Sequence, residues 1–403
     1  MIRYGRARVE STARKETPMR MSVRPATVGA ALLFAAPALC AGRPATPAKV
    51  TAGDARPRID VVFVLDTTGS MGGLIEGAKA KIWSIANQMI SAKPTPRLRI
   101  GLVGYRDRGD EYVTRRFDLS DDIDAIYGHL QGFQAGGGGD TPESVNQALR
   151  EAVRDMSWTP SRDALKIVFL VGDAPPHMDY EGDVPYPVTL QEAVKKDLIV
   201  NTVQCGSIGA TAPVWKEIAR LAEGSYAAIG QTGDMQVVST PMDEELARLN
   251  REIGTTLVAY GSVETRGAVM AKQARAEAAA PAAAADRLAY NVATSKVVQG
   301  GGDLVDDLKD GRAKLGELKA DELPAELKGK SPEQQKAYLA QQEEKRKKLQ
   351  AEVAELVKKR QAYVDAEMKK AAAAGKGTGF DLEVAQTLKA QAKRKNIAFA
   401  TAP

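Results

Sequence analysis

The sequence predicts an α/β fold: a doubly wound, mostly parallel sheet covered by helices on both faces and followed by an α-helical tail. Apolar runs rich in β-branched residues alternate with amphipathic stretches from residue 59 to about residue 260. These runs are continuously apolar, which is typical of strands buried on both faces of a parallel sheet. Beyond that region the chain becomes rich in alanine and in alternating charges, and its apolar residues fall at helical spacing.

Five strands and five helices are expected within the first region. The predicted strands cover residues 60–65, 98–105, 166–171, 199–203 and 225–229. The predicted helices cover residues 74–90, 123–130, 142–156, 189–196 and 213–222. In such a sheet, ligands bind beyond the carboxyl ends of the strands, where the strand order reverses. The residues that follow the first strand are therefore expected to lie at a binding edge.

Two segments after residue 260 differ in composition. Residues 261–302 are rich in alanine and glycine, and Pro281 and the glycines at 300–302 predict a connector with flexible breaks. Residues 303–403 are the expected helical C-terminal region, in which residues 331–334 form a capping box with proline at the first helical position. The narrow apolar stripe of the following helix is typical of a helical hairpin or coiled coil, or of helix-mediated association with a partner. We expect this region to be separable from the sheet and dispensable for metal binding.

Residues 1–41 are expected to be a signal peptide, and residues 42–57 a linker. Arg20 and Arg24 precede an apolar run at residues 26–39 that is too short to span a bilayer, and small residues follow it. Cleavage of this segment predicts a periplasmic or secreted protein with no transmembrane span in the mature chain. The alternative is a protein held at the membrane by a lipid or by the uncleaved segment.

The charge distribution argues against nucleic acid as a partner. The formal net charge is +5, and residues 1–41 hold seven Lys or Arg and two Glu, so the remainder of the chain is neutral. A chain with no excess of basic residues lacks the electrostatic footprint of a nucleic-acid-binding protein.

Three separated segments carry oxygen-bearing side chains to one predicted edge of the sheet. The stretch "LDTTGSM" places Asp66, Thr68 and Ser70 directly after the first strand. Thr141 lies in "GGGGDTPES", ahead of a helix, and Asp173 follows the strand in "VFLVGDAPPH". Carboxylates and neutral hydroxyls suit a hard cation, so these residues predict a Mg²⁺ site, with Mn²⁺ or Ca²⁺ as alternatives. With only two carboxylates among these ligands, the ion is expected to keep an open coordination position for an external carboxylate.

Other polar residues near these segments have less specific interpretations. The chain has two histidines, His129 and His177, and isolated histidines are more often structural than catalytic. His177 follows Asp173 by four residues and is expected to line the metal rim. Arg106 and Asp107, which follow the second strand, are expected to form a local ion pair.

Taken in order, the three segments resemble the von Willebrand factor type A domain, and the resemblance covers residues 58–260. That family places a metal-ion-dependent adhesion site on an Asp-x-Ser-x-Ser loop, a separate Thr and a separate Asp. The matching residues, with Thr at the first Ser position, are Asp66, Thr68, Ser70, Thr141 and Asp173. "GYRDRGDE" and "GGGGDTPE" look most like the bacterial and alpha-kinase-associated branch. The resemblance implies a non-enzymatic module that binds an acidic group of a protein partner through a divalent cation.

Two alternatives stay open at this point. "DTTGS" also resembles the loop of aspartyl-phosphate enzymes, so the chain could be a hydrolase or phosphotransferase with Asp66 as nucleophile. That chemistry also needs a later Gly-Asp-Gly-x-Asn-Asp motif, whereas Asp173 is followed here by Ala-Pro-Pro. The second alternative is a structural scaffold whose metal loop is vestigial and whose helices carry the function.

Overall fold

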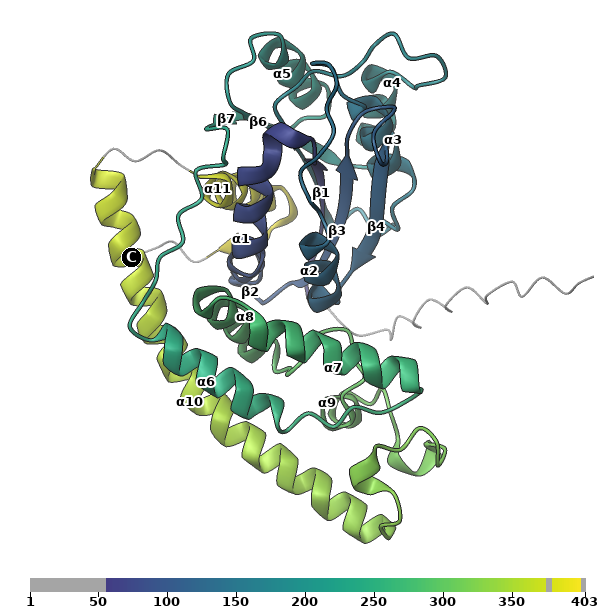
Figure 1. Cartoon of the computed structure of the whole chain (residues 1–403), viewed down its shortest axis with the longest axis vertical. Coiled ribbons are helices and arrows are strands. Elements are labelled where there is room, and N and C mark those ends of the chain that lie inside the picture. Colours follow the sequence, from purple (N-terminus) through teal and green to yellow (C-terminus); the bar gives the residue numbers. More distant parts are fainter. Residues whose placement is uncertain (1–55, 375–378, 400–403) are drawn as a thin grey trace, which may run out of the picture. The chain divides into compact units, whose positions relative to one another are not determined.

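The computed structural model describes residues 56–374 and 379–399. The expected signal peptide, and all but the last two residues of the expected linker, lie outside these ranges. Within them, no helix combines the length and the apolar character needed to cross a membrane. The described residues contain a central sheet, helices against both of its faces, and a further group of helices (Figure 1).

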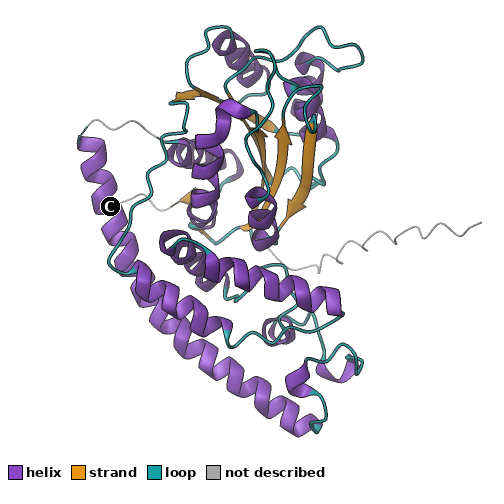
Figure 2. Cartoon of the chain, viewed as in Figure 1, coloured by secondary structure: helices purple, strands orange, loops and turns teal. Residues whose placement is uncertain are grey.

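The central sheet has six strands in the order β4-β3-β1-β5-β6-β7, shown in orange in Figure 2. In chain order they are β1 (Arg58–Asp66), β3 (Arg97–Tyr105), β4 (Thr114–Ser120), β5 (Leu165–Gly172), β6 (Ile199–Cys205) and β7 (Tyr226–Ile229). Neighbouring strands are parallel except β3 and β4, which are antiparallel. The strand order reverses at β1, so the predicted doubly wound, mostly parallel sheet is confirmed. β4 is an edge strand that the sequence analysis did not predict.

The side chains of β1 enter two apolar cores because successive residues of a strand point to opposite faces. Val61, Phe63 and Leu65 pack in one core, and Val62 and Val64 pack in the other. The helices α1 (Gly72–Ile90), α2 (Ile123–Gln131) and α11 (Phe380–Ala392) contribute to the first core, and Tyr290 of α8 (Pro281–Thr294) also belongs to it. Three helices contribute to the second: α3 (Val145–Arg154), α4 (Tyr186–Lys195) and α5 (Thr211–Leu221). The sheet is therefore covered on both faces, as predicted.

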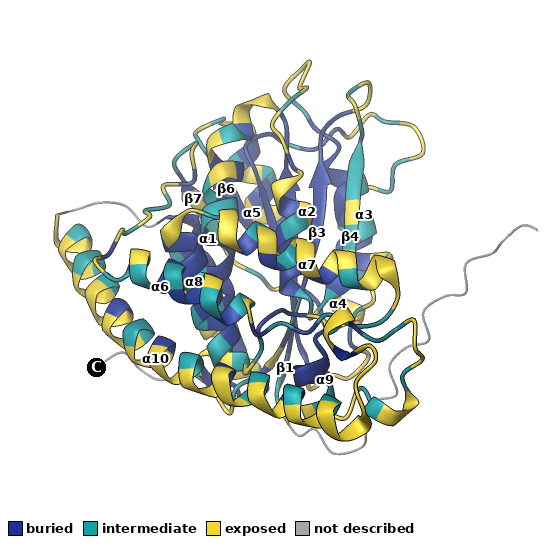
Figure 3. Ribbon diagram, turned by 60° about the horizontal axis from the view of Figure 1, so that its bottom comes forward, coloured by how far each residue is buried: buried dark blue, intermediate teal, exposed yellow. Residues whose placement is uncertain are grey.

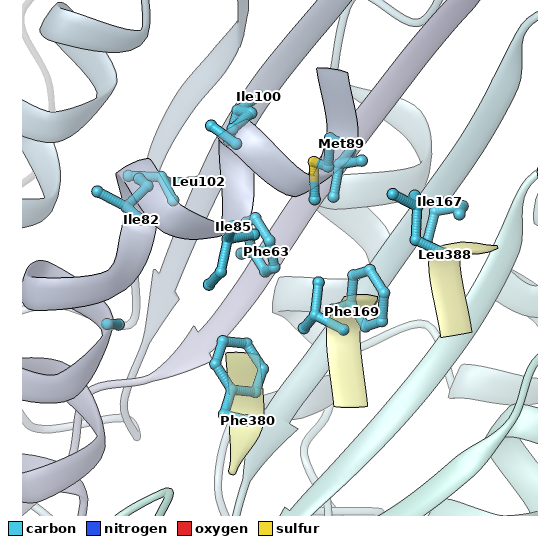
Figure 4. Packing of buried hydrophobic residues seen from close by; sticks show 14 of the residues in the cluster. Phe63, Ile82, Ile85, Met89, Ile100, Leu102, Ile167, Phe169, Phe380 and Leu388 are labelled. Carbon is cyan, nitrogen blue, oxygen red and sulfur yellow. The ribbon is translucent and has the colours of Figure 1, made fainter. Parts of the chain in front are cut away.

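The helix α11 packs on the sheet rather than on the other C-terminal helices. Phe380 lies edge-on to Phe63, with ring centroids 6.0 Å apart, and Leu388 belongs to the same core (Figure 4). Gln391 also exchanges side-chain hydrogen bonds with Asn201 of β6, at 2.6 and 3.1 Å. This differs from the expectation that residues 303–403 bury their apolar side chains among themselves. The cause is the local pattern of α11, whose large apolar residues fit the space between α1 and β5.

The region expected to be a flexible connector is largely helical. It contains α7 (Val263–Ala278) and α8 (Pro281–Thr294), and α6 (Asp243–Gly254) precedes them. Pro281 begins α8, because proline at the first helical position loses no hydrogen bond. The small alanines of α8 let it lie close to α1 and α6, so they fill a packed interface rather than a linker.

The long helix α10 (Pro332–Ala373) lies along α6 and α8, as Figure 1 shows. Ser331 and Gln334 form the predicted capping box at its start. Val353 is buried against α6 and α8, whereas much of the rest of α10 is exposed (Figure 3). Two buried arginines also hold the helix in place: Arg346 pairs with Asp303 and Asp306, and Arg360 with Asp243 and Asp286. The region thus contains a long helix, but its partners precede it in the chain.

Candidate metal centre

Two of the predicted metal ligands, Asp66 and Asp173, lie at the carboxyl edge of the sheet. Asp66 is the last residue of β1, and Asp173 follows β5 directly. Because β1 and β5 are adjacent and parallel, both residues lie at the same edge. The backbone amide of Thr67 donates to the carbonyl of Tyr105 at 2.8 Å, so the loop after β1 stays attached to β3.

The loop after β1 orients its three polar side chains toward one another. Asp66 Oδ1 accepts hydrogen bonds from the amide of Thr68 at 2.8 Å and from its hydroxyl at 2.6 Å. Thr68 Oγ1 is in turn 3.3 Å from Ser70 Oγ. Ser70 is exposed, whereas Asp66 and Thr68 are buried. The carboxylate and the two hydroxyls thus form one connected group that opens to solvent at Ser70.

The Asp66 carboxyl group lacks the neutralising contacts that a buried charge normally has. Its Oδ2 has no hydrogen-bond partner among the described residues. The pKa of Asp66 is raised to about 7, chiefly by burial and also by the charge of Asp173, against the lowering effect of the hydrogen bonds from Thr68. A buried carboxylate without a cation is costly, so this position favours a bound positive charge.

Gln231 links Asp173 to the first loop, a contact that no sequence pattern predicts. Its Nε2 lies 2.8 Å from Asp173 Oδ2 and 3.3 Å from the carbonyl oxygen of Ser70. Thr211 donates to the backbone carbonyl of Asp173 at 2.6 Å. Gln231 follows β7, the edge strand of the sheet, and an isolated glutamine after a strand has no distinctive sequence pattern.

Close backbone packing brings the two aspartates together. A Cβ atom at Gly172 would lie 2.4 Å from the Tyr105 hydroxyl, 2.9 Å from Asp66 Cβ and 3.0 Å from Asp66 Oδ2. Such distances are well inside van der Waals contact, so only glycine fits beside Asp66 at this point of β5. The absence of a side chain at Gly172 therefore permits the approach of β5 to Asp66.

Thr141 is not joined to the other four residues by a hydrogen bond within the described ranges. It is exposed, in the glycine-rich loop that precedes α3. The loop itself contacts the first loop: the amide of Gly69 donates to the carbonyl of Gly137 at 3.3 Å, and that of Gly136 to Thr67 at 3.1 Å. The predicted helix at 142–156 begins at Val145 instead, because Glu143 pairs with Pro176 beside β5.

Glu143 is a buried acid that the sequence analysis did not select. Only 3% of its surface is exposed, and its Oε2 has no hydrogen-bond partner in residues 56–374 or 379–399. Burial, followed by the charges of Asp66, Asp107, Asp110 and Asp173, raises its pKa to about 9. A third carboxyl group therefore lies near the predicted centre.

A second cluster of ligand atoms lies on the same side of the sheet. One side-chain atom from each of Asp107, Asp140 and His177 can be chosen so that all lie within 4.8 Å of one another. This agrees with the expectation that His177 lines the rim. The expected ion pair of Arg106 with Asp107 was wrong: Arg106 instead pairs with Glu111, at 3.4 Å.

The donor set at Asp66 fits a hard divalent cation. It combines carboxylates with neutral hydroxyls, the oxygen ligands that Mg²⁺ and related ions prefer. Asp66 Oδ2 and Glu143 Oε2 are buried acceptor atoms without a donor in the part of the chain that the structure describes.

Comparison with known proteins identifies the sheet region. The family described as von Willebrand factor A domain matches residues 60–206. The chain contains a von Willebrand factor A domain. Proteins with this domain form a family of interaction modules, which agrees with the resemblance drawn from "DTTGSM", Thr141 and Asp173.

Three curated relatives match this von Willebrand factor A domain over about 30% of the chain. They are an ariadne-like RING finger protein of Acanthamoeba polyphaga mimivirus (31% identical), the alpha-protein kinase vwkA of Dictyostelium discoideum (27%) and the von Willebrand factor A domain-containing protein 7 of Mus musculus (37%). The chain matches 11%, 19% and 13% of their lengths, respectively. Among solved structures, mussel proximal thread matrix protein 1 with a zinc-occupied metal-ion-dependent adhesion site is 17% identical, with a TM-score of 0.34, over 43% of this chain and 42% of that one.

Proposed function

We propose that this protein is exported and that its von Willebrand factor A domain binds a carboxylate of a protein partner through a divalent cation, with Mg²⁺ as the first candidate. One observation carries the proposal: Asp66 is fully buried at the sheet edge, its Oδ2 has no hydrogen-bond partner among residues 56–374 and 379–399, and the buried hydroxyl of Thr68 connects it to the exposed Ser70. A cation would neutralise that carboxylate and leave a positive position facing outward.

The proposed ligands are the five residues from the sequence analysis. Asp66, Thr68 and Ser70 come from the loop after β1, Asp173 from the end of β5, and Thr141 from the glycine-rich loop. The bound ion would supply a Lewis acid for an anionic oxygen of the partner. The five residues would hold the ion at the rim of the sheet. Thr68 fixes the orientation of the Asp66 side chain, and Gln231 fixes that of Asp173.

Calorimetry of the metal-stripped protein tests this proposal. Titration with Mg²⁺ should give a saturable heat with the unchanged chain and none with Asp66→Asn, which keeps the shape and one acceptor of the aspartate. Asp163→Asn is the matched control, since it removes an equal charge at an exposed position outside the cluster. In EDTA the Asp66→Asn variant should melt no lower than the unchanged protein, because the substitution removes a charge that burial disfavours. An unaltered Mg²⁺ affinity in Asp66→Asn would contradict the proposal.

The same variant separates binding from phosphoryl transfer. Asp66 has no exposed surface, so its carboxylate is not presented to a phosphoryl donor as a nucleophile would be. Incubation with radiolabelled acetyl phosphate and Mg²⁺ should therefore leave the protein unlabelled. Stable labelling that Asp66→Asn abolishes would favour the aspartyl-phosphate alternative instead.

Export is tested separately, at the N-terminus of the protein made in cells. The proposal rests on the apolar run at residues 26–39 and the small residues after it. We expect N-terminal sequencing of the periplasmic or secreted fraction to start between residues 39 and 42. A cytoplasmic protein that retains the run would refute export and leave the metal proposal intact.

A further inference from the structure

Three side chains outside the first loop form a second potential coordination site. Asp107 follows β3, Asp140 lies in the glycine-rich loop, and His177 follows β5 by a few residues. His177 Nε2 is 3.4 Å from Asp107 Oδ2 and 3.6 Å from Asp140 Oδ2. This set contains neither Asp66 nor Asp173.

The imidazole of His177 is oriented so that one nitrogen faces the two carboxylates. Its Nδ1 lies 2.8 Å from Asp179 Oδ1, and a carboxylate can only accept, so Nδ1 carries the proton and donates it. Tyr180 stacks on the ring at 3.9 Å, with an angle of 12° between the planes. Nε2 has no hydrogen-bond partner among the described residues, although only 7% of His177 is exposed. In the neutral ring, the Nε2 lone pair is therefore unsatisfied, although Asp107 Oδ2 and Asp140 Oδ2 lie 3.4 and 3.6 Å away.

Asp107 is equally well fixed. Ser144 donates to its Oδ1 at 2.9 Å, and the hydroxyl of Tyr180 donates to its Oδ2 at 2.6 Å. Asp107 is 5% exposed, so it is a buried carboxylate that retains free lone pairs. Two of the three groups are thus buried and rigid, while Asp140 is exposed and free to adjust.

A buried lone pair close to two carboxylates is unfavourable unless a cation lies among the three groups. A proton on Nε2 is one solution: burial lowers the pKa of His177, but the hydrogen bond to Asp179 and the charges of Asp107 and Asp140 raise it overall. A metal ion is the other solution, and it can bind all three groups at once. The hydrogen bond from a ligating histidine to a carboxylate is the arrangement that commonly orients metal-bound imidazoles.

We propose that Asp107, Asp140 and His177 bind a second divalent cation, a first-row transition metal ion of the Zn²⁺ type, separate from the ion at Asp66. Imidazole nitrogen combined with carboxylate oxygen suits such an ion better than Mg²⁺, which prefers oxygen ligands alone. Three protein ligands leave a coordination position open at the exposed Asp140 side. This proposal does not depend on the one for Asp66, because the two sites share no ligand.

Cobalt provides a visible probe for this site. Titration of the EDTA-stripped protein with Co²⁺ should produce a d–d absorption band, and Zn²⁺ should displace it. His177→Gln should weaken Co²⁺ binding by at least about tenfold, since even loss of an orienting carboxylate typically costs that much. His129→Gln is the matched control, because it removes the other of the chain's two histidines from an exposed position. Equal Co²⁺ affinity in His177→Gln and His129→Gln would overturn the proposal.

Nitrogen NMR of the unchanged protein gives a result that does not depend on the folding of a variant. With two histidines in the chain, the imidazole spectrum contains two spin systems. Zn²⁺ should shift Nε2 of His177 and leave His129 in place. An imidazolium at His177 that is insensitive to excess Zn²⁺ would show that a proton occupies the site and would refute the inference. Asp66→Asn should retain the Zn²⁺ response, and His177→Gln should retain the Mg²⁺ heat, so failure of one site is distinguishable from failure of the other.

Discussion

At the scale of single residues, the candidate metal centre depends on a missing side chain as much as on those present. Gly172 lies where the Tyr105 hydroxyl and Asp66 would collide with a methyl group. The two strands carrying Asp66 and Asp173 can be adjacent at this edge only because that position is glycine.

We predict that Gly172→Ala destabilises the fold and weakens metal binding. Overpacking of a close-packed interior typically costs about 1–3 kcal/mol, and here the displaced group is the Asp66 side chain itself. Urea denaturation should show the loss of stability, and Mg²⁺ calorimetry the loss of affinity. Gly209→Ala is the control, because a Cβ atom there meets no atom within 4 Å. Matching results for the two variants would mean that the packing beside Asp66 is looser than described.

Some residues of the site could be predicted from the sequence, and others could not. Asp66 and Asp173 could be placed because each follows a continuously apolar run that predicts a buried strand. Glu143 and Gln231 could not, since their proximity to the site results from a loop path and an edge strand that no local pattern encodes. His177 could be placed near the rim by its distance from Asp173, but its orientation depends on Tyr180 and Asp179.

At the scale of elements, the predictions were best where the apolar pattern was strongest. The strands at 60–65 and 166–171 are buried along their whole lengths in β1 and β5. β4 was missed because "TRRFDLS" is an edge strand with mostly polar, half-exposed residues, so its only signal is weak alternation. The sequence also could not reveal which elements pack together, since the capping box of α10 defines a helix start but not a partner.

We predict that Arg346→Met loosens α10 from the helices before it. The guanidinium lies 2.6 Å from both Asp303 and Asp306 and also donates to the carbonyl of Thr256. Removal leaves two buried acids unpaired, and breaking a buried pair from one side typically costs about 3–5 kcal/mol. Lys348→Met is the matched control on the same helix, where the side chain is 76% exposed. Comparable urea midpoints for the two variants would show that the buried ion pairs do not anchor α10.

At the scale of the whole molecule, the sheet core includes a helix from the distant C-terminal region. Phe380 and Leu388 of α11 belong to the same apolar core as Phe63 and Phe169 (Figure 4). The sequence analysis predicted that residues 303–403 are separable from the sheet. A chain that ends near residue 300 would then stay folded. The burial of α11 reverses that expectation, because its removal would expose these aromatic side chains to water.

We therefore predict that a chain ending at Ala374 is markedly less stable than the full chain. Urea denaturation followed by circular dichroism should show the loss, and a dye that binds apolar surface should fluoresce more strongly with the shortened protein. A peptide of residues 379–399 added in trans should restore stability, whereas the same peptide with Phe380→Ala and Leu388→Ala should not. A shortened chain that unfolds at the same urea concentration as the full chain would show that α11 is dispensable.

The position of α11 in the chain also has a consequence for biosynthesis. Gln391 of α11 lies 190 positions beyond its hydrogen-bonding partner Asn201, and Phe63 lies further upstream still. During translation the part of this core that α11 covers therefore stays exposed until α11 has been synthesised. Transiently exposed apolar surface is what chaperones recognise in nascent chains. A nascent chain that lacks α11 would therefore expose apolar side chains of this core that the complete chain buries.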